Sequence, residues 1–499
     1  MLFTTQQNKP TTNSMSKQRT LKTNQKQVTL NLGDGKPLVV SGGGGNLTGL
    51  GGLPLLRKIE KIFKLVEGAS SRLQDHRTQS LIDHNIFDLW FVRVATIAAG
   101  LPDCNDADLV MQDAGLLKAL GRDPGEGQNG PSQPTLSRFE NSLSAEDLDK
   151  LSDFLLEYYV KTHRKAPRQL ILYADGTAVE THGKQQGAVR RGGKYKMEML
   201  FPLLVFDEHG WLLAAELREG DKGEAPSGTA IIKRLVERLR AAWPHVKVGL
   251  RLDAGFPCPG LFSWCEKNSI DYVVGIAGNF AIASKAAGYL REAKRKFICK
   301  HGDPEFTSRK GKRKKQRIHA KIRRMPKDER MEAENAWKKR RVRLFGELLY
   351  QSRTWKKERR IICRIDYTDD GVQSRYLVTN LTWGSAQQIY EQEYCPHARV
   401  ELCIKELKNS LALRLSCCEF NANAFRLFLH ALAYQLLYHL RTLLPPAFRD
   451  LSFETIRKRF ITVAARVNCS ARRVYWALSD TYAYTKDFMR LCRRLARAG

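Results

Sequence analysis

Two apolar, β-rich runs that each end in an aspartate constrain the fold more than any other feature. Residues 168–174 (RQLILYA) lead directly into Asp175, and residues 246–252 (VKVGLRL) lead directly into Asp253. Short runs of this composition, closed by a turn of small residues, are typical of buried strands. Strands and helices alternate over residues 168–280. Because ligands and catalytic groups collect beyond the carboxyl ends of strands in such sheets, we expect an α/β domain with both aspartates at one edge.

A third acid lies on a predicted helix over residues 394–408 (YCPHARVELCIKELK). Pro396 suits the first turn of a helix, and neither Gly nor Pro interrupts the chain until about residue 415. Glu401, Lys405 and Lys408 are spaced to share one helical face. On this segment alone, an ordinary surface pair is the favoured explanation of Glu401 and Lys405. An adjoining face carries the residues expected to pack on a core: Ile404, Leu407 and Leu411.

The three acids, taken together, resemble a known set. Asp175, Asp253 and Glu401 are similar to the acidic triad of the DDE transposases of bacterial insertion sequences, which have an RNase H-like fold. Carboxylate oxygens are the ligands that hard cations such as Mg²⁺ favour. The resemblance covers roughly residues 50–495 and includes further stretches in the expected order: 132–141, 175–188, 212–220, 250–256 and 404–411.

The segment around Glu401 resembles the family signature Tyr-x2-Arg-x3-Glu-x6-Lys. Tyr394, Glu401 and Lys408 match it, whereas His397 stands where the signature has Arg. The resemblance implies that Tyr394, His397 and Lys408 hold a DNA end, with Lys405 as a further contact. A packed tyrosine and a solvated lysine are the alternatives for Tyr394 and Lys408.

The resemblance also implies a domain plan of the α/β class. An RNase H-like catalytic domain is interrupted by a mainly β insertion and flanked by helical N-terminal and C-terminal parts. The predicted segments are a disordered leader with a short hairpin and a flexible Gly-rich linker (1–52), a helical DNA-binding domain (53–166), the first catalytic part (167–280), the basic insertion (281–382), the second catalytic part (383–445) and a basic helical extension (446–499).

A formal net charge of +31 on 499 residues indicates a polyanionic partner, and nucleic acid fits best. Residues 291–360 alone hold 27 Lys or Arg against 9 Asp or Glu. Within them we expect a phosphate-contacting loop, with a solvated loop as the alternative; its four central cations are Lys312, Arg313, Lys314 and Lys315. No apolar run reaches the ~18 residues of a membrane span. The 11 cysteines form no CxxC pair, which favours reduced thiols and therefore a cytoplasmic protein. With DNA as the partner, we expect the protein at the nucleoid.

Three further side chains are candidates for DNA contacts. Arg138 lies on a short predicted helix after Pro134, which suits either a recognition helix or an ordinary packing helix. Trp355 and Trp383 are candidates to stack on a displaced base, and a place in the core explains each equally well.

The resemblance implies a complete activity. The triad holds two Mg²⁺ ions, for which Mn²⁺ substitutes, and the enzyme binds terminal inverted repeats of double-stranded DNA. Water cleaves the transposon end, and the freed 3′-OH attacks the target in cut-and-paste transposition. Because two ends must be brought together, a homodimer on DNA is expected. The alternatives are a domesticated nuclease or recombinase of the same fold and an inactive DNA-binding protein.

Overall fold

The computed structural model describes residues 28–30, 36–40, 45–124, 127–192, 195–223, 225–305, 307–326, 329–333 and 340–498. The leader predicted to be disordered, residues 1–27, lies outside them. Among the helices of these ranges, none combines the length and apolar character that a membrane crossing requires.

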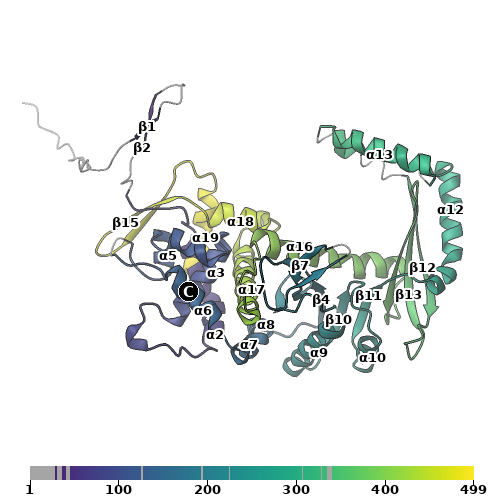
Figure 1. The fold of residues 1–499 in the computed structure, drawn as a ribbon, viewed down its shortest axis with the longest axis horizontal. Helices are drawn as coiled ribbons and strands as arrows, with labels where there is room; N and C mark the ends of the chain where they lie inside the picture. The colour runs from purple at the N-terminus through teal and green to yellow at the C-terminus, as the bar shows by residue number, and fades with distance from the viewer. Residues whose placement is uncertain are drawn as a thin grey trace, which may run out of the picture.

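An eight-stranded mixed sheet, here called the central sheet, has the order β12-β13-β14-β11-β10-β4-β8-β9 and lies to one side of α17 (Phe420–Leu443) (Figure 1). The strands β4, β10 and β11 run parallel, and β8 and β9 are antiparallel additions beside β4. Both predicted buried strands are therefore confirmed. The elements of this half are β4 (Gln169–Gly176), β8 (Leu203–Asp207), β9 (Leu212–Glu216), α9 (Ala225–Ala242), β10 (Lys247–Leu252), α10 (Pro259–Lys267) and β11 (Asp271–Ile276). A small sheet, β5-β7-β6, lies beside it: β5 (Val179–Glu180), β6 (Val189–Arg191) and β7 (Met197–Leu200).

Residues 281–382 differ from the mainly β insertion that was predicted there. The first half of this segment is helical: α11 (Phe280–Lys285), α12 (Ala287–His301) and α13 (Arg309–Arg323). Its second half extends the central sheet through pairing of β14 with β11: β12 (Arg341–Tyr350), β13 (Arg359–Thr368) and β14 (Gly371–Thr379). The basic run forms a helix because Lys, Arg and Ala favour helices, and the Ser308 hydroxyl accepts a hydrogen bond from the N–H of Gly311.

Helices from both ends of the chain pack around α17 (Phe420–Leu443), which is almost wholly buried. The helical prediction for 53–166 is confirmed, and one of its helices begins with a capping box of Ser144 and Asp147. His430 and His439 of α17 are both buried in this packing. The helices of this module are α1 (Leu53–Phe63), α2 (Leu65–Ser70), α3 (Ile86–Ala99), α4 (Ala107–Val110), α5 (Ala114–Ala119), α6 (Gln133–Asn141), α7 (Ala145–Ser152) and α8 (Phe154–Thr162).

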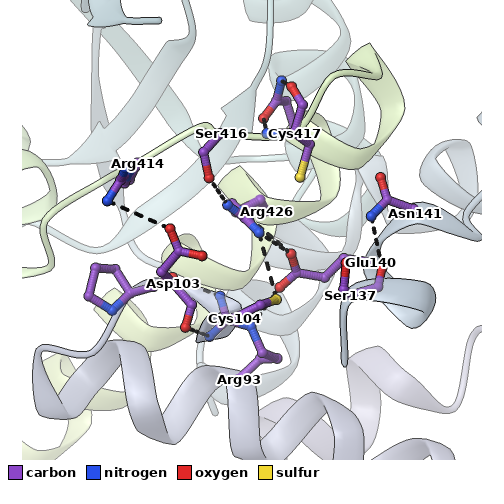
Figure 2. Close-up of polar contacts among 12 residues, drawn as sticks. Arg93, Asp103, Cys104, Ser137, Glu140, Asn141, Arg414, Ser416, Cys417 and Arg426 are labelled. Carbon is purple, nitrogen blue, oxygen red and sulfur yellow. Dashed lines mark hydrogen bonds and ion pairs between the residues drawn. The ribbon is translucent and has the colours of Figure 1, made fainter. Parts of the chain in front are cut away.

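A buried ion cluster joins three helices of this module (Figure 2). Glu140 of α6 is fully buried, and its carboxylate accepts hydrogen bonds from Arg93 of α3 and Arg426 of α17, both 2.6 Å long at their shortest. Arg426 also donates to the Ser416 hydroxyl. Because an unpaired charge is costly in a protein interior, this cluster fixes α6 against α3 and α17.

Two expectations about the termini are wrong. The predicted helical C-terminal extension contains a hairpin of β15 (Ala465–Cys469) and β16 (Val474–Leu478) between α18 (Phe453–Phe460) and α19 (Thr485–Arg497). β15 pairs with β3 (Leu47–Thr48), and Gly51 and Gly52 donate hydrogen bonds to the carbonyls of Val463 and Ile461, so the described part of the predicted flexible glycine linker is packed. A side chain at Gly52 would meet the Phe460 carbonyl at 1.8 Å, which explains the glycine there. The predicted N-terminal hairpin is confirmed as β1 (Val28–Leu30) and β2 (Leu38–Val40).

Candidate active site

The register of the central sheet places the two aspartates beside each other. Ala174 of β4 lies opposite Leu252 of β10, so the next residue of each parallel strand is Asp175 and Asp253. Both are half-buried. The carboxylate of Asp253 accepts a hydrogen bond from the N–H of Gly255 at 2.8 Å, which orients it at the turn. The carboxyl edge of the sheet therefore presents two neighbouring carboxylates.

Glu401 lies on an irregular helical segment that runs across this edge and packs against β4. The predicted helix is confirmed up to Ser410, and the chain leaves helical geometry beyond that residue. The buried flank is also confirmed, and Glu401 itself is exposed. The parts of the segment are α15 (Ala386–Gln388), π-helical η3 (Ile389–Tyr394), 3-10 helical η4 (Cys395–His397), α16 (Ala398–Lys405) and π-helical η5 (Glu406–Ser410).

Two contacts fix the start of this segment to the central strands. The buried guanidinium of Arg251, on β10, forms an ion pair with Glu393 and donates to its carbonyl at 3.1 Å. The Tyr394 hydroxyl lies 3.0 Å from where a side chain on Gly275 of β11 would begin. Burial, with Tyr390 and Asp253 close by, raises the pKa of Tyr394 to about 12, so its hydroxyl stays protonated at neutral pH.

A third contact fixes the end of the segment. The ammonium of Lys408 donates a 2.6 Å hydrogen bond to the carbonyl of Ala178, three residues after Asp175. Burial lowers the pKa of Lys408. The solvated lysine that was one alternative is therefore wrong. Lys405 is exposed, and in the described part of the chain it makes no ion pair with Glu401, so the surface-pair alternative is also wrong.

The carboxylates of Asp175, Asp253 and Glu401 are ligands of the type that a hard cation prefers, but they are not arranged as a metal site. Among the described residues, no three His, Cys, Asp or Glu side chains lie close enough together to hold a metal ion. Asp175 and Asp253 lie at neighbouring strand ends, whereas Glu401 faces solvent from its helix. A site that uses all three needs Glu401 to approach the strand ends.

The four central cations of the basic insertion lie on the helix α13, not on a loop. Lys312 and Arg313 are exposed and have no ion-pair partner among the described residues. Lys314 pairs with Glu305 at 3.2 Å, and Lys315 pairs with Asp370. Two of the four cations, Lys314 and Lys315, are therefore partly neutralised by acidic residues of the same protein.

The remaining predicted contacts have different environments. Arg138 is exposed beside a cavity of about 640 Å³, although the opposite face of α6 is packed, as the packing alternative requires. Trp355 contacts Phe262 edge to face at a centroid distance of 5.7 Å, which supports its place in the core. Trp383 is 53% exposed and remains available for stacking. The side chain of His397 lies outside what the structure describes.

The family described as Transposase DDE domain group 1 matches residues 30–499, which is nearly the whole chain. The chain belongs to this transposase family. No curated protein sequence matches it. Its structure is similar to that in the cryo-EM structure of the piggyBac transposase synaptic complex with hairpin DNA, at 10% sequence identity and a TM-score of 0.39. That likeness covers 82% of this chain and 79% of the other, and its TM-score is too low to assign a fold.

Sequence reasoning missed two features of this transposase. Arg251 is the charged residue within the buried part of β10, residues 248–252, and a charge at such a position was the available signal for a buried ion pair. Arg375 on β14 is exposed, and its positive charge acts on the Tyr394 phenol and opposes the rise of its pKa. Because Arg375 comes from an inserted strand, only the pairing of β14 with β11 places it at the site.

Proposed function

We propose that this transposase serves an insertion sequence by binding its terminal inverted repeats, cleaving there and joining the freed end to target DNA. The observation that carries the proposal is the register that makes Asp175 and Asp253 neighbours beneath the helix that bears Glu401. The strand order β9-β8-β4-β10-β11, with β4, β10 and β11 parallel, supports an RNase H-like catalytic core.

Each proposed residue has a role that its position supports. Asp175, Asp253 and Glu401 supply carboxylate oxygens, and the proposed ions are Mg²⁺, with Mn²⁺ as a substitute. Such ions activate an attacking oxygen and stabilise a leaving one when bound. Tyr394 and Lys408 hold the Glu401 segment against the sheet, and two N–H donors of Lys408 remain for a phosphate.

The test compares the variants Asp175→Asn, Asp253→Asn and Glu401→Gln for plasmid nicking with Mg²⁺ and for affinity to a duplex from the DNA that flanks the coding region. Each variant should lose nicking and keep affinity, and the double variants should lose no more, because the carboxylates act as one unit. Asp271→Asn is the matched control, since Asp271 is exposed at the opposite end of β11. Normal nicking by one of the three variants removes that residue from the site.

The other functions predict different results. An inactive DNA-binding protein shows affinity without nicking in the wild type. A domesticated nuclease nicks DNA, but no inverted repeats flank its coding region. For the transposase we propose a homodimer on DNA, acting at the nucleoid, and sedimentation with and without a two-ended duplex measures that state.

A further inference from the structure

The hairpin β15–β16 has one packed face and one open face. The strand β3 pairs with β15 only at its base, at Ala465 and Arg466, and beyond these residues the hairpin continues as a two-stranded ribbon. Side chains alternate along β15, so that Ala465 and Val467 are buried while Arg466 and Asn468 are exposed. On β16, Tyr475 lies opposite Asn468 and is 57% exposed. The open face therefore combines a guanidinium, an amide and an aromatic ring.

The packed face holds the ribbon firmly to the helical module. The indole N–H of Trp476 donates to the Gly51 carbonyl at 3.1 Å, and the N–H of Val467 donates to the Asn46 carbonyl at 2.9 Å. A turn at Ser470 closes the tip through a 2.9 Å hydrogen bond from its N–H to the Arg473 carbonyl. The ribbon is thus a preorganised projection.

The charge of this ribbon is entirely positive. Residues 465–478 contain Arg466, Arg472 and Arg473 and no Asp or Glu. All three arginines are exposed, and none has an ion-pair partner among the described residues. Elsewhere the protein neutralises many of its cations, as with Lys315 on α13. Unpaired guanidinium groups at a rigid tip are suited to a polyanion.

We propose that the β15–β16 ribbon binds duplex DNA, with its tip on the phosphates and its open face in a groove. The inference rests on the proposed function and adds a contact surface to it. The major groove of B-DNA admits a two-stranded ribbon, and arginine and asparagine are the side chains that pair with guanine and adenine edges there. Arg472 and Arg473 contact phosphates, whereas Arg466, Asn468 and Tyr475 face the bases.

The ribbon and the basic helix α13 lie toward opposite ends of the long axis of the molecule, with α17 between them (Figure 1). DNA that reaches the ribbon is therefore a different stretch from DNA that reaches α13. Because the two surfaces neutralise different phosphates, substitutions in the ribbon and in α13 should each lower the slope of log affinity against log salt, and the two decreases should add in a combined variant.

The experiment uses the full chain, a duplex from the DNA flanking the coding region and a scrambled duplex of equal length. Arg472→Ala with Arg473→Ala should weaken both complexes and lower the slope of log affinity against log salt by about 0.9 per lost phosphate contact, about 2 in total. Asn468→Ala should weaken the flanking duplex more than the scrambled one. Arg466→Lys keeps the positive charge but cannot form a bidentate hydrogen bond to a base. It should therefore reduce the preference for the flanking over the scrambled duplex and leave the salt slope unchanged.

The control is Arg164→Ala with Lys165→Ala, an equal loss of charge at exposed residues before β4. It should leave slope and preference unchanged. Unfolding in urea checks the fold, since exposed substitutions should shift stability by no more than about 0.5 kcal/mol. An unchanged slope in the tip variant overturns the inference, and so does altered self-association at unchanged DNA affinity, which would make the ribbon a protein interface. Metal-dependent nicking by the wild type tests the proposed function separately.

Discussion

Replacing Glu140 with glutamine should destabilise the helical module strongly. Glu140 is the anion between Arg93 and Arg426, and its side chain is fully buried. Burial by itself raises the pKa of Glu140, but the charges and hydrogen bonds of the two arginines outweigh burial and hold the pKa below its usual 4.5. The carboxylate is therefore ionised at neutral pH and balances two buried cations.

The size of the effect follows from these contacts. Removing one partner of a buried ion pair costs about 3–5 kcal/mol, because the other charge is left uncompensated. Glutamine keeps the shape and one acceptor oxygen, but its NH₂ group then faces guanidinium N–H donors. We expect a loss of about 3–5 kcal/mol, a large part of the 5–15 kcal/mol that typically separates folded from unfolded protein.

The assay is urea unfolding, combined with hydrogen exchange of peptides from α3, α6 and α17. Glu146→Gln on the exposed surface of α7 is the matched control and should change stability by no more than about 0.5 kcal/mol. A carboxyl group whose pKa is lower in the folded than in the unfolded protein stabilises the folded state at pH values above the unfolded-state pKa. This stabilisation is lost as the pH falls through the folded-state pKa. The difference between wild type and Glu140→Gln should therefore shrink below about pH 4. Equal stabilities for the two glutamine variants at neutral pH would refute this reasoning.

Two other predictions concern DNA binding. Lys312→Ala with Arg313→Ala should lower the salt slope for flanking and scrambled duplexes alike, by more than Lys314→Ala with Lys315→Ala, because the second pair is already engaged by acids; equal slopes for both variants would contradict this. If His397 contacts the DNA end, affinity measured from about pH 8 to 6 should rise as imidazole gains its proton, and His397→Arg should flatten that rise while His397→Ala weakens binding most at low pH. Parallel curves of affinity against pH for all three proteins would mean that His397 does not contact the phosphate, and Arg399 would then be the candidate for that contact.

The sequence by itself determined the parts of the site that local patterns encode. Short apolar runs ending at Asp175 and Asp253 predict strands, because each run is complete within a few residues. The spacing of Ile404 and Leu407 predicts the buried side of the Glu401 helix for the same reason. Family resemblance supplied the link between these pieces, and the family match supports it.

Only the tertiary structure decided which distant segments meet. The strand β14 joins β11 although about a hundred residues separate them, which turns a predicted separate domain into an extension of the central sheet. The short strands β15 and β16 lie in a basic tail that was predicted to be helical, and the indole of Trp476 fixes the ribbon by a hydrogen bond to the carbonyl of Gly51, more than four hundred residues away. Glu140 carries no local sign of burial, since its two cations come from other helices. Such contacts depend on complementary surfaces that are distant in sequence, so no window of neighbouring residues contains them.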